Sequence, residues 1–317
     1  MRPLGKVAKP VADAVPEVLY HYTTAAGLLG ILKRDDNSLW ASAIGFSNDT
    51  SEGRYATKMG AQILQRYDKA PKASPPVKGS ALSPFVPDWG QEVQRTRGWF
   101  SSSTKHREYA YSISFCEEDN LLSQWRAYGG VASFSLGFQY FPAKALLRPS
   151  GFESRLVKIE YDATKQKEFF RSILDQTRRT FDTQSALFSR LDDNASLTAR
   201  IASIQMRRAL TVWAHSVKHV AFKEEKEWRL IVMPTQGMIN QHVSSPDNVE
   251  AAEFREFRGR LLPYVRVSPP NGRFDLKSIT VGPSRTQMLE VRAVNLFLEK
   301  SGLKGVEVNI SDTPLQS

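Results

Sequence analysis

Alternating apolar and polar positions occur near both ends of the chain, whereas helical spacing dominates its middle. The clearest alternation is AYSISFC, residues 110–116, where Tyr111, Ile113 and Phe115 would lie on one side of a strand and small side chains on the other. Similar character predicts further strands at residues 18–22, 39–44, 132–138, 156–161, 226–232, 261–267, 278–282 and 305–310.

Helices are predicted between these strands. Thr23 or Thr24 can cap a helix over residues 25–32, and residues 119–129 have helical spacing that stops at two glycines. A further helix is expected over residues 286–300. Strands, then a long helical block, then strands again predict an α+β fold with one mixed, mainly antiparallel sheet.

We expect two parts along the chain: a short arm, residues 1–17, and a single α+β domain, residues 18–315. Within the domain, residues 164–220 carry apolar side chains at every third or fourth position, which predicts an inserted helical subdomain. Residues 70–105 hold five prolines among many serines and glycines, which predicts a partly ordered insertion and a candidate lid.

Composition narrows the class of protein. The 317 residues are 41% hydrophobic and 24% charged, which is typical of a globular chain. No apolar run approaches the roughly 18 to 20 residues of a membrane helix, so we expect a cytoplasmic protein without a membrane partner. Lysine and arginine outnumber aspartate and glutamate by 43 to 33, and the net charge of +10 suits either a nucleic-acid partner or a soluble surface.

Several kinds of site are not expected. The chain has no Walker loop, no GxGxxG and no GxSxG. We therefore do not expect a kinase, an NTPase, a Rossmann-type dinucleotide-binding protein or a hydrolase with a nucleophile elbow. Its one cysteine, Cys116, precedes three acidic residues that would raise the pKa of the thiol, so we do not expect a nucleophile. His215 and His219 are four residues apart but lack the acid of a zinc-protease motif, and no metal site is predicted.

The densest charge on a predicted strand lies in FKEEKEWR, residues 222–229. In an extended chain Glu225, Glu227 and Arg229 would share one face, with Trp228 on the other. Neighbouring carboxylates indicate either a solvated edge strand or a site that uses the charge.

Two other segments carry candidate binding residues. His21 stands just before a predicted helix N-terminus, where it can be a packed histidine or can contact a ribose hydroxyl beside a phosphate. In SQWRAYGG, residues 123–130, Trp125 and Tyr128 can form a core stripe or a wall for a planar ring, with Arg126 near an anion.

Six segments, in this order along the chain, resemble a large bacterial family of uncharacterised proteins that is suspected of roles in phage defence. They are LYHYTTAAGLLGILKRDDNSLWAS, SNDTSE, SISFCEEDNLLSQWRAYGG, HVAFKEEKEWRLIV, FRGRLLPYVRV and SITVGPS. A second resemblance is to the ADP-ribosyltransferase fold. It rests on the opening strand with His21-Tyr22-Thr23, the central strand with Ser112-Ile113-Ser114 and the late strand with Glu225-Lys226-Glu227.

The second resemblance implies an NAD-dependent ADP-ribosyltransferase-like effector. Glu227 would hydrogen-bond the ribose 2′-OH and stabilise an oxocarbenium-like transition state, and Glu225 would meet the acceptor. His21 would hold the adenosine ribose, while Tyr22 and Thr23 would help to fix nicotinamide.

The rest of the implied NAD site is less defined. Tyr111, Trp125 and Tyr128 compete for the place of the ring that stacks on nicotinamide, and Ser112 and Arg126 complete the expected site. The basic charge suits a DNA or RNA acceptor, and the family suggests phage defence or a toxin system with an antitoxin or defence partner.

Two alternatives remain open. A non-enzymatic nucleic-acid or nucleotide-binding module would pair Glu225 and Glu227 with Arg229 or another cation. A Mg²⁺-dependent nuclease would gather Asp49, Glu52, Glu225 and Glu227 around the ion. Transferase chemistry predicts instead that His21 and Glu227 converge, with an aromatic between them.

Overall fold

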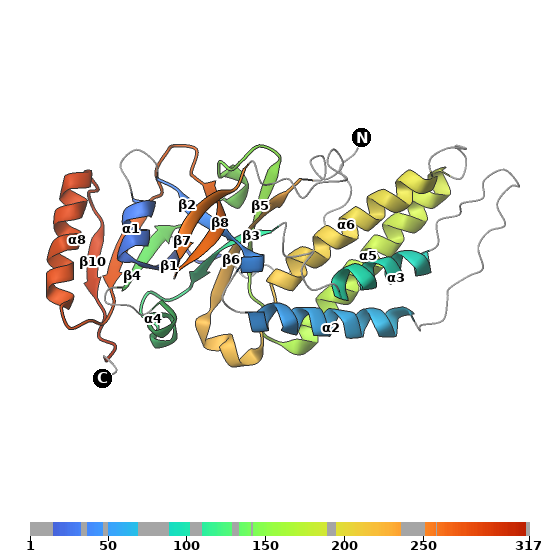
Figure 1. Ribbon diagram of the computed structural model, residues 1–317, viewed down its shortest axis with the longest axis horizontal. Coiled ribbons are helices and arrows are strands. Elements are labelled where there is room, and N and C mark those ends of the chain that lie inside the picture. The colour runs from blue at the N-terminus through green and yellow to red at the C-terminus, as the bar shows by residue number, and fades with distance from the viewer. Residues whose placement is uncertain are drawn as a thin grey trace, which may run out of the picture.

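The protein was analysed as a computed structural model in which the sheet and a bundle of helices lie at opposite ends of an elongated molecule (Figure 1). The structure describes residues 15–32, 37–46, 50–68, 89–101, 110–128, 133–140, 142–188, 195–235, 251–257 and 259–314. Within these ranges, no helix is both long and apolar enough to cross a membrane.

The described strands form one open sheet that is mainly antiparallel; only β9 and β10 pair in parallel. The order along the main path is β10-β9-β4-β1-β3-β2-β8-β7, with β6 beside β3 and β5 beside β6. The strands are β1 (Val18–Thr24), β2 (Leu39–Ala43), β3 (Tyr111–Cys116), β4 (Ser133–Gln139), β5 (Phe152–Lys158), β6 (Glu227–Pro234), β7 (Glu253–Phe257), β8 (Arg260–Val267), β9 (Leu276–Val281) and β10 (Glu307–Ile310).

The helices fall into two groups. The first covers the sheet: α1 (Ala25–Ile31), α4 (Leu122–Tyr128) and α8 (Gln287–Ser301), the last at the far end beside β10 (Figure 1). The second forms the bundle: α2 (Thr50–Asp68), α3 (Trp89–Ser101), α5 (Ala163–Phe188) and α6 (Ala195–His215). Short 3-10 turns are η1 (Ile44–Phe46), η2 (Ala143–Ala145) and η3 (Val220–Glu225).

Each group has its own hydrophobic core. On the sheet, Tyr111, Ile113 and Phe115 are buried together with residues of α1 and α8, so the predicted alternation of β3 is confirmed. In the bundle, a separate cluster is centred on the fully buried Trp213 and Phe170, whose rings meet edge to face at 4.7 Å. The helices expected between residues 164 and 220 are confirmed as α5 and α6.

Strand β3 is the branch point of the sheet. Along one edge it pairs with β6 over its whole length, from Tyr111 to Cys116. Its other edge is shared: β1 pairs only at Cys116, and β2 pairs only at Tyr111 and Ser112. β1 and β2 therefore leave the same edge of β3 in different directions, and we call the gap between them the fork.

Some predicted elements differ from the structure. Part of the proline-rich segment, predicted as loop, forms α3, because a tryptophan, a valine and a phenylalanine supply a buried stripe against the bundle. Residues 69–88 and 102–109 of that segment lie outside the described part, as does most of the N-terminal arm. Helix α2 and strand β7 were not predicted. Strand β5 lies earlier than the pattern suggested, because the chain turns away from β6 after Ile159 and bridges from Glu160 to Val217 instead.

Candidate functional site

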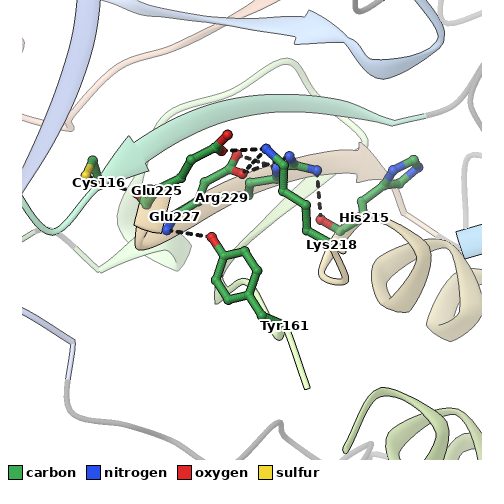
Figure 2. Close-up of polar contacts among 7 residues, drawn as sticks. All are labelled: Cys116, Tyr161, His215, Lys218, Glu225, Glu227 and Arg229. Carbon is green, nitrogen blue, oxygen red and sulfur yellow. Dashed lines mark hydrogen bonds and ion pairs between the residues drawn. The ribbon is translucent and has the colours of Figure 1, made fainter. Parts of the chain in front are cut away.

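Charged side chains gather where β6 begins, close to the end of α6 (Figure 2). Lys218, Glu227 and Arg229 are buried there, and Glu225 is half-buried. Glu227, the first residue of β6, lies opposite Cys116 of β3 and is 4% exposed. Arg229 binds its carboxylate through two nitrogens, Nε at 2.6 Å from Oε1 and Nη2 at 2.9 Å from Oε2. This fork-to-fork contact fixes the orientation of the carboxylate.

Glu225 reaches the same place from a different element. It ends η3, and Lys226 follows with a left-handed backbone (φ 43°), so Glu225 does not continue the strand as predicted. Its Oε2 lies 2.5 Å from Nζ of Lys218, and the same ammonium lies 3.3 Å from Oε2 of Glu227. One buried lysine therefore bridges the two carboxylates, which would otherwise repel each other.

The ionisation state of Glu227 follows from these contacts. Burial alone would raise the pKa of this carboxyl, but the charges of Arg229 and Lys218 outweigh burial and hold the pKa at about 2. Glu227 is therefore a carboxylate at neutral pH. It can accept hydrogen bonds and stabilise positive charge, but it has no proton to donate.

The bundle fixes Lys218. The side-chain amide of Gln166, on α5, donates to the carbonyl of Lys218 at 2.8 Å and to that of Glu160 at 2.6 Å. The amide of Lys218 donates to the carbonyl of Glu160 at 3.1 Å. Because both main-chain groups of Lys218 are held, the position of its ammonium depends on how the bundle meets the sheet.

The start of β6 is held in a similar way. The Glu227 amide donates to the hydroxyl of Tyr161 at 3.1 Å, and Nη1 of Arg229 lies 3.4 Å from the carbonyl of His215 at the end of α6 (Figure 2). Tyr161 and Lys218 were not among the predicted site residues. The feature of the sequence that could have pointed to Lys218 is its place as a lysine in a mostly apolar stretch just before FKEEKEWR.

His21 lies at the fork. Its Nδ1 donates to the main-chain oxygen of Ser114 at 2.9 Å, in the stretch of β3 that neither β1 nor β2 pairs. The hydroxyl of Ser114 helps to hold down the pKa of the Glu227 carboxyl. His21 and Glu227 therefore both interact with the same residue of β3, from its two edges. Burial, together with the charge of Arg255, lowers the pKa of His21 to about 4, so its imidazole is neutral.

Tyr22 and Trp125, two predicted ligand contacts, pack against each other. Their rings meet edge to face at 4.7 Å in a small buried cluster with Cys116. The Tyr22 hydroxyl donates to the carbonyl of Glu118, and the Trp125 indole donates to the side chain of Asn120 at 2.8 Å. These contacts attach α4 to β1.

The other predicted contacts are dispersed. Tyr111 packs in the sheet core, Ser112 lies half-buried opposite Ser42, and Thr23 is buried against Gly27 of α1. Thr24, the alternative capping residue, is the one that caps α1. Arg126 is exposed on α4, and the side chain of Tyr128 lies outside the described part.

Side chains that could bind a metal ion are scattered in the described ranges. There, no group of three or more histidine, cysteine, aspartate or glutamate side chains is placed to hold an ion. Asp49 and the side chain of Glu52 lie outside those ranges, so their convergence with Glu225 and Glu227 stays a prediction.

Comparison with known sequences adds one finding. The sequence model of a family described as proteins of unknown function, DUF2971, matches residues 124–230, from α4 into β6. No curated protein and no solved structure matches the chain. The matched segment contains Lys218, Glu225, Glu227 and Arg229, so this part of the chain, charged site included, is similar to an uncharacterised family.

Proposed function

We propose that the protein is an NAD-dependent ADP-ribosyltransferase. The observation that supports this most directly is the meeting of His21 and Glu227 on Ser114, at the fork of the sheet. A nucleotide held at the fork would lie between a neutral imidazole and an ionised carboxylate. Because Nδ1 of His21 donates to Ser114, its Nε2 is left to accept a hydrogen bond from the ligand. The resemblance to the ADP-ribosyltransferase fold on the same three strands agrees with this assignment.

The chemistry uses the charge of Glu227. Cleavage of the nicotinamide–ribose bond develops positive charge on the ribose, and nicotinamide leaves with the bonding electrons. A carboxylate that accepts a hydrogen bond from the ribose 2′-OH stabilises that charge. Since Arg229 and Lys218 contact both oxygens of Glu227, the 2′-OH would replace the longer contact, which is the one from Lys218 at 3.3 Å.

Glu225 lies on the other side of Lys218 and is assigned to the acceptor. Its carboxylate would take the proton from the attacking group of the acceptor as the new bond to the ribose forms. The net charge of +10 suits DNA or RNA as that acceptor. We place the activity in the bacterial cytoplasm, in a phage-defence or toxin system.

Nicotinamide release from NAD tests the proposal. Purified protein is incubated with NAD in the presence of DNA, RNA or total cell protein, and nicotinamide and transferred ADP-ribose are followed by mass spectrometry. Glu227→Gln should lower release by about 10²- to 10³-fold while NAD affinity stays within a few fold. Glu224→Gln, at an exposed neighbouring position, is the matched control and should leave release unchanged.

Wild-type protein that binds NAD but releases no nicotinamide with any of these acceptors would contradict the proposal. Equal release by the wild type and Glu227→Gln would also contradict it. Circular dichroism and thermal unfolding of both variants separate a chemical effect from a loss of fold.

A nucleotide-binding module without turnover is the second candidate. It is favoured by the ion pairs of Glu227 with Arg229 and Lys218, which are the cation contacts expected of a carboxylate with a structural role. On this assignment the protein binds NAD or ADP, releases no nicotinamide, and Glu227→Gln reduces stability.

A further inference from the structure

Arg255 belongs to an outer strand of the sheet but reaches back toward the fork. It lies on β7, which pairs with β8, and β8 in turn pairs with β2. Its Nη2 donates to the hydroxyl of Ser42 on β2 at 2.9 Å. The side chain therefore crosses the face of β8, and its guanidinium lies beside the strand that forms one arm of the fork.

Aromatic rings hold this guanidinium. Its central carbon lies 5.3 Å from the ring centroid of Trp40 and 5.7 Å from that of Phe257. Trp40 is itself stacked on Tyr264, with centroids 5.0 Å apart and an interplanar angle of 29°. A guanidinium oriented by rings loses little further freedom when it binds a planar or branched anion.

Trp40 also packs against α1, the helix between the two arms of the fork along the chain. Its ring lies against Gly30 of α1, where an added Cβ would come within 2.6 Å of the ring. Helix α1 joins β1 to β2, so Trp40 spans from β2 to the helix above the fork. Trp40 and Arg255 are both only half-buried.

The charge of Arg255 reaches His21. It contributes, after burial, to the lowered pKa of that imidazole. A positive potential at the fork favours an anionic ligand, and the fork is where the proposed function places a nucleotide. Arg255 can present several donors in one plane to phosphate oxygens, which lysine cannot do.

We propose that Arg255, oriented by Ser42, Trp40 and Phe257, binds the diphosphate of the nucleotide at the fork. The inference rests on the proposed function for the location of the nucleotide, and it adds the group that recognises phosphate. Neither β7 nor Trp40 lies in the segment matched by the family of unknown function.

Calorimetric binding of four probes tests the assignment: NAD, ADP, inorganic pyrophosphate and adenosine. Arg255→Gln should weaken NAD, ADP and pyrophosphate by at least about 10-fold and leave adenosine within about 2-fold. Arg255→Lys keeps the charge but loses the planar donors, so its affinities for NAD, ADP and pyrophosphate should lie between those of the wild type and Arg255→Gln. Arg266→Gln is the matched control, because Arg266 is an exposed β8 arginine paired with Glu253 at 2.6 Å.

The outcomes separate this inference from the proposed function. If the wild type binds NAD and ADP and Arg255→Gln leaves these affinities unchanged, the role of Arg255 is overturned and the proposed function is not. The same holds if Arg255→Gln weakens adenosine and ADP equally. Binding of ADP and pyrophosphate through Arg255 without nicotinamide release overturns the transferase and supports the phosphate site. A wild type that binds none of the three phosphate probes overturns the role of Arg255.

Discussion

Lys218 and Glu225 form an ion pair, with 2.5 Å between Nζ and Oε2, in which the lysine is buried and the glutamate half-buried. The same ammonium also contacts Glu227, so the attraction of one cation offsets the repulsion of two carboxylates. Removing one partner of a buried pair leaves an uncompensated charge, which costs about 3 to 5 kcal/mol. We therefore expect Lys218→Met to lower the free energy of unfolding by about that amount in urea denaturation at pH 7.

A double-mutant cycle isolates the pair. Lys218→Met strands the carboxylate of Glu225, while Glu227 keeps its contact with Arg229. Adding Glu225→Gln removes the stranded charge, so the loss of stability in the double variant should be smaller than the sum of the single losses by about 1 kcal/mol or more. Lys226→Met is the control, since Lys226 pairs with Glu118 on the surface and its loss should cost far less than that of Lys218. Equal losses for Lys218→Met and Lys226→Met would show that the bridge contributes little.

His21 predicts a pH dependence of stability. Its pKa is about 4 in the folded protein and near 6.5 in an unfolded chain, so the unfolded state binds the extra proton between these values. The free energy of unfolding should therefore fall as the pH drops from 6.5 toward 4, by at most about 1.4 kcal/mol per pH unit from this group.

His21→Asn isolates that slope. Its side-chain amide can still donate to the oxygen of Ser114, but it does not titrate. As the pH drops from 7 to 5, the free energy of unfolding of the wild type should fall relative to that of His21→Asn. Parallel pH profiles for wild type and His21→Asn would mean that the histidine is not held neutral.

Two helical glycines should respond in opposite directions to alanine. Gly60 of α2 faces the bundle core, where an added Cβ would lie 2.2 Å from the ring of Phe100 and 2.9 Å from that of Phe170. Overpacking of this kind costs about 1 to 3 kcal/mol, more than the helix propensity gained. Gly98 of α3 has no atom within 4 Å of an added Cβ, so Gly98→Ala should stabilise by about 0.5 to 1 kcal/mol. Urea midpoints that shift in the same direction would contradict the packing of α2.

Cys116 should react with thiol reagents only after unfolding. Burial raises the pKa of its thiol to about 12, and Sγ donates to the carbonyl of Glu225 at 3.1 Å. The thiolate that attacks such reagents is therefore scarce and covered. Labelling with iodoacetamide at pH 8 should be slow in buffer and fast in urea, with a midpoint that matches loss of circular dichroism. Rapid labelling of the folded protein would contradict the burial.

Much of the fold could be predicted from local pattern. Alternation placed β3 and its buried face, the threonines before α1 indicated its start, and helical spacing located α5 and α6. Helix α2 was missed because its buried face includes a glycine and an alanine, whose small side chains weaken the apolar signal. Glu225 was placed on a strand because an extended reading of FKEEKEWR does not anticipate the left-handed turn at Lys226.

The sequence by itself determined where most strands and helices lie and which side of the clearly patterned ones is apolar, because these depend on neighbours within a few positions. It also named His21, Glu225 and Glu227 as candidates. Only the tertiary structure decided that Lys218 bridges the two carboxylates, that Ser114 joins His21 to Glu227, and that Arg255 reaches the fork. Those contacts join residues as many as 213 positions apart in the Arg255–Ser42 case. Strand register and chain reversal, which local periodicity does not encode, bring them together.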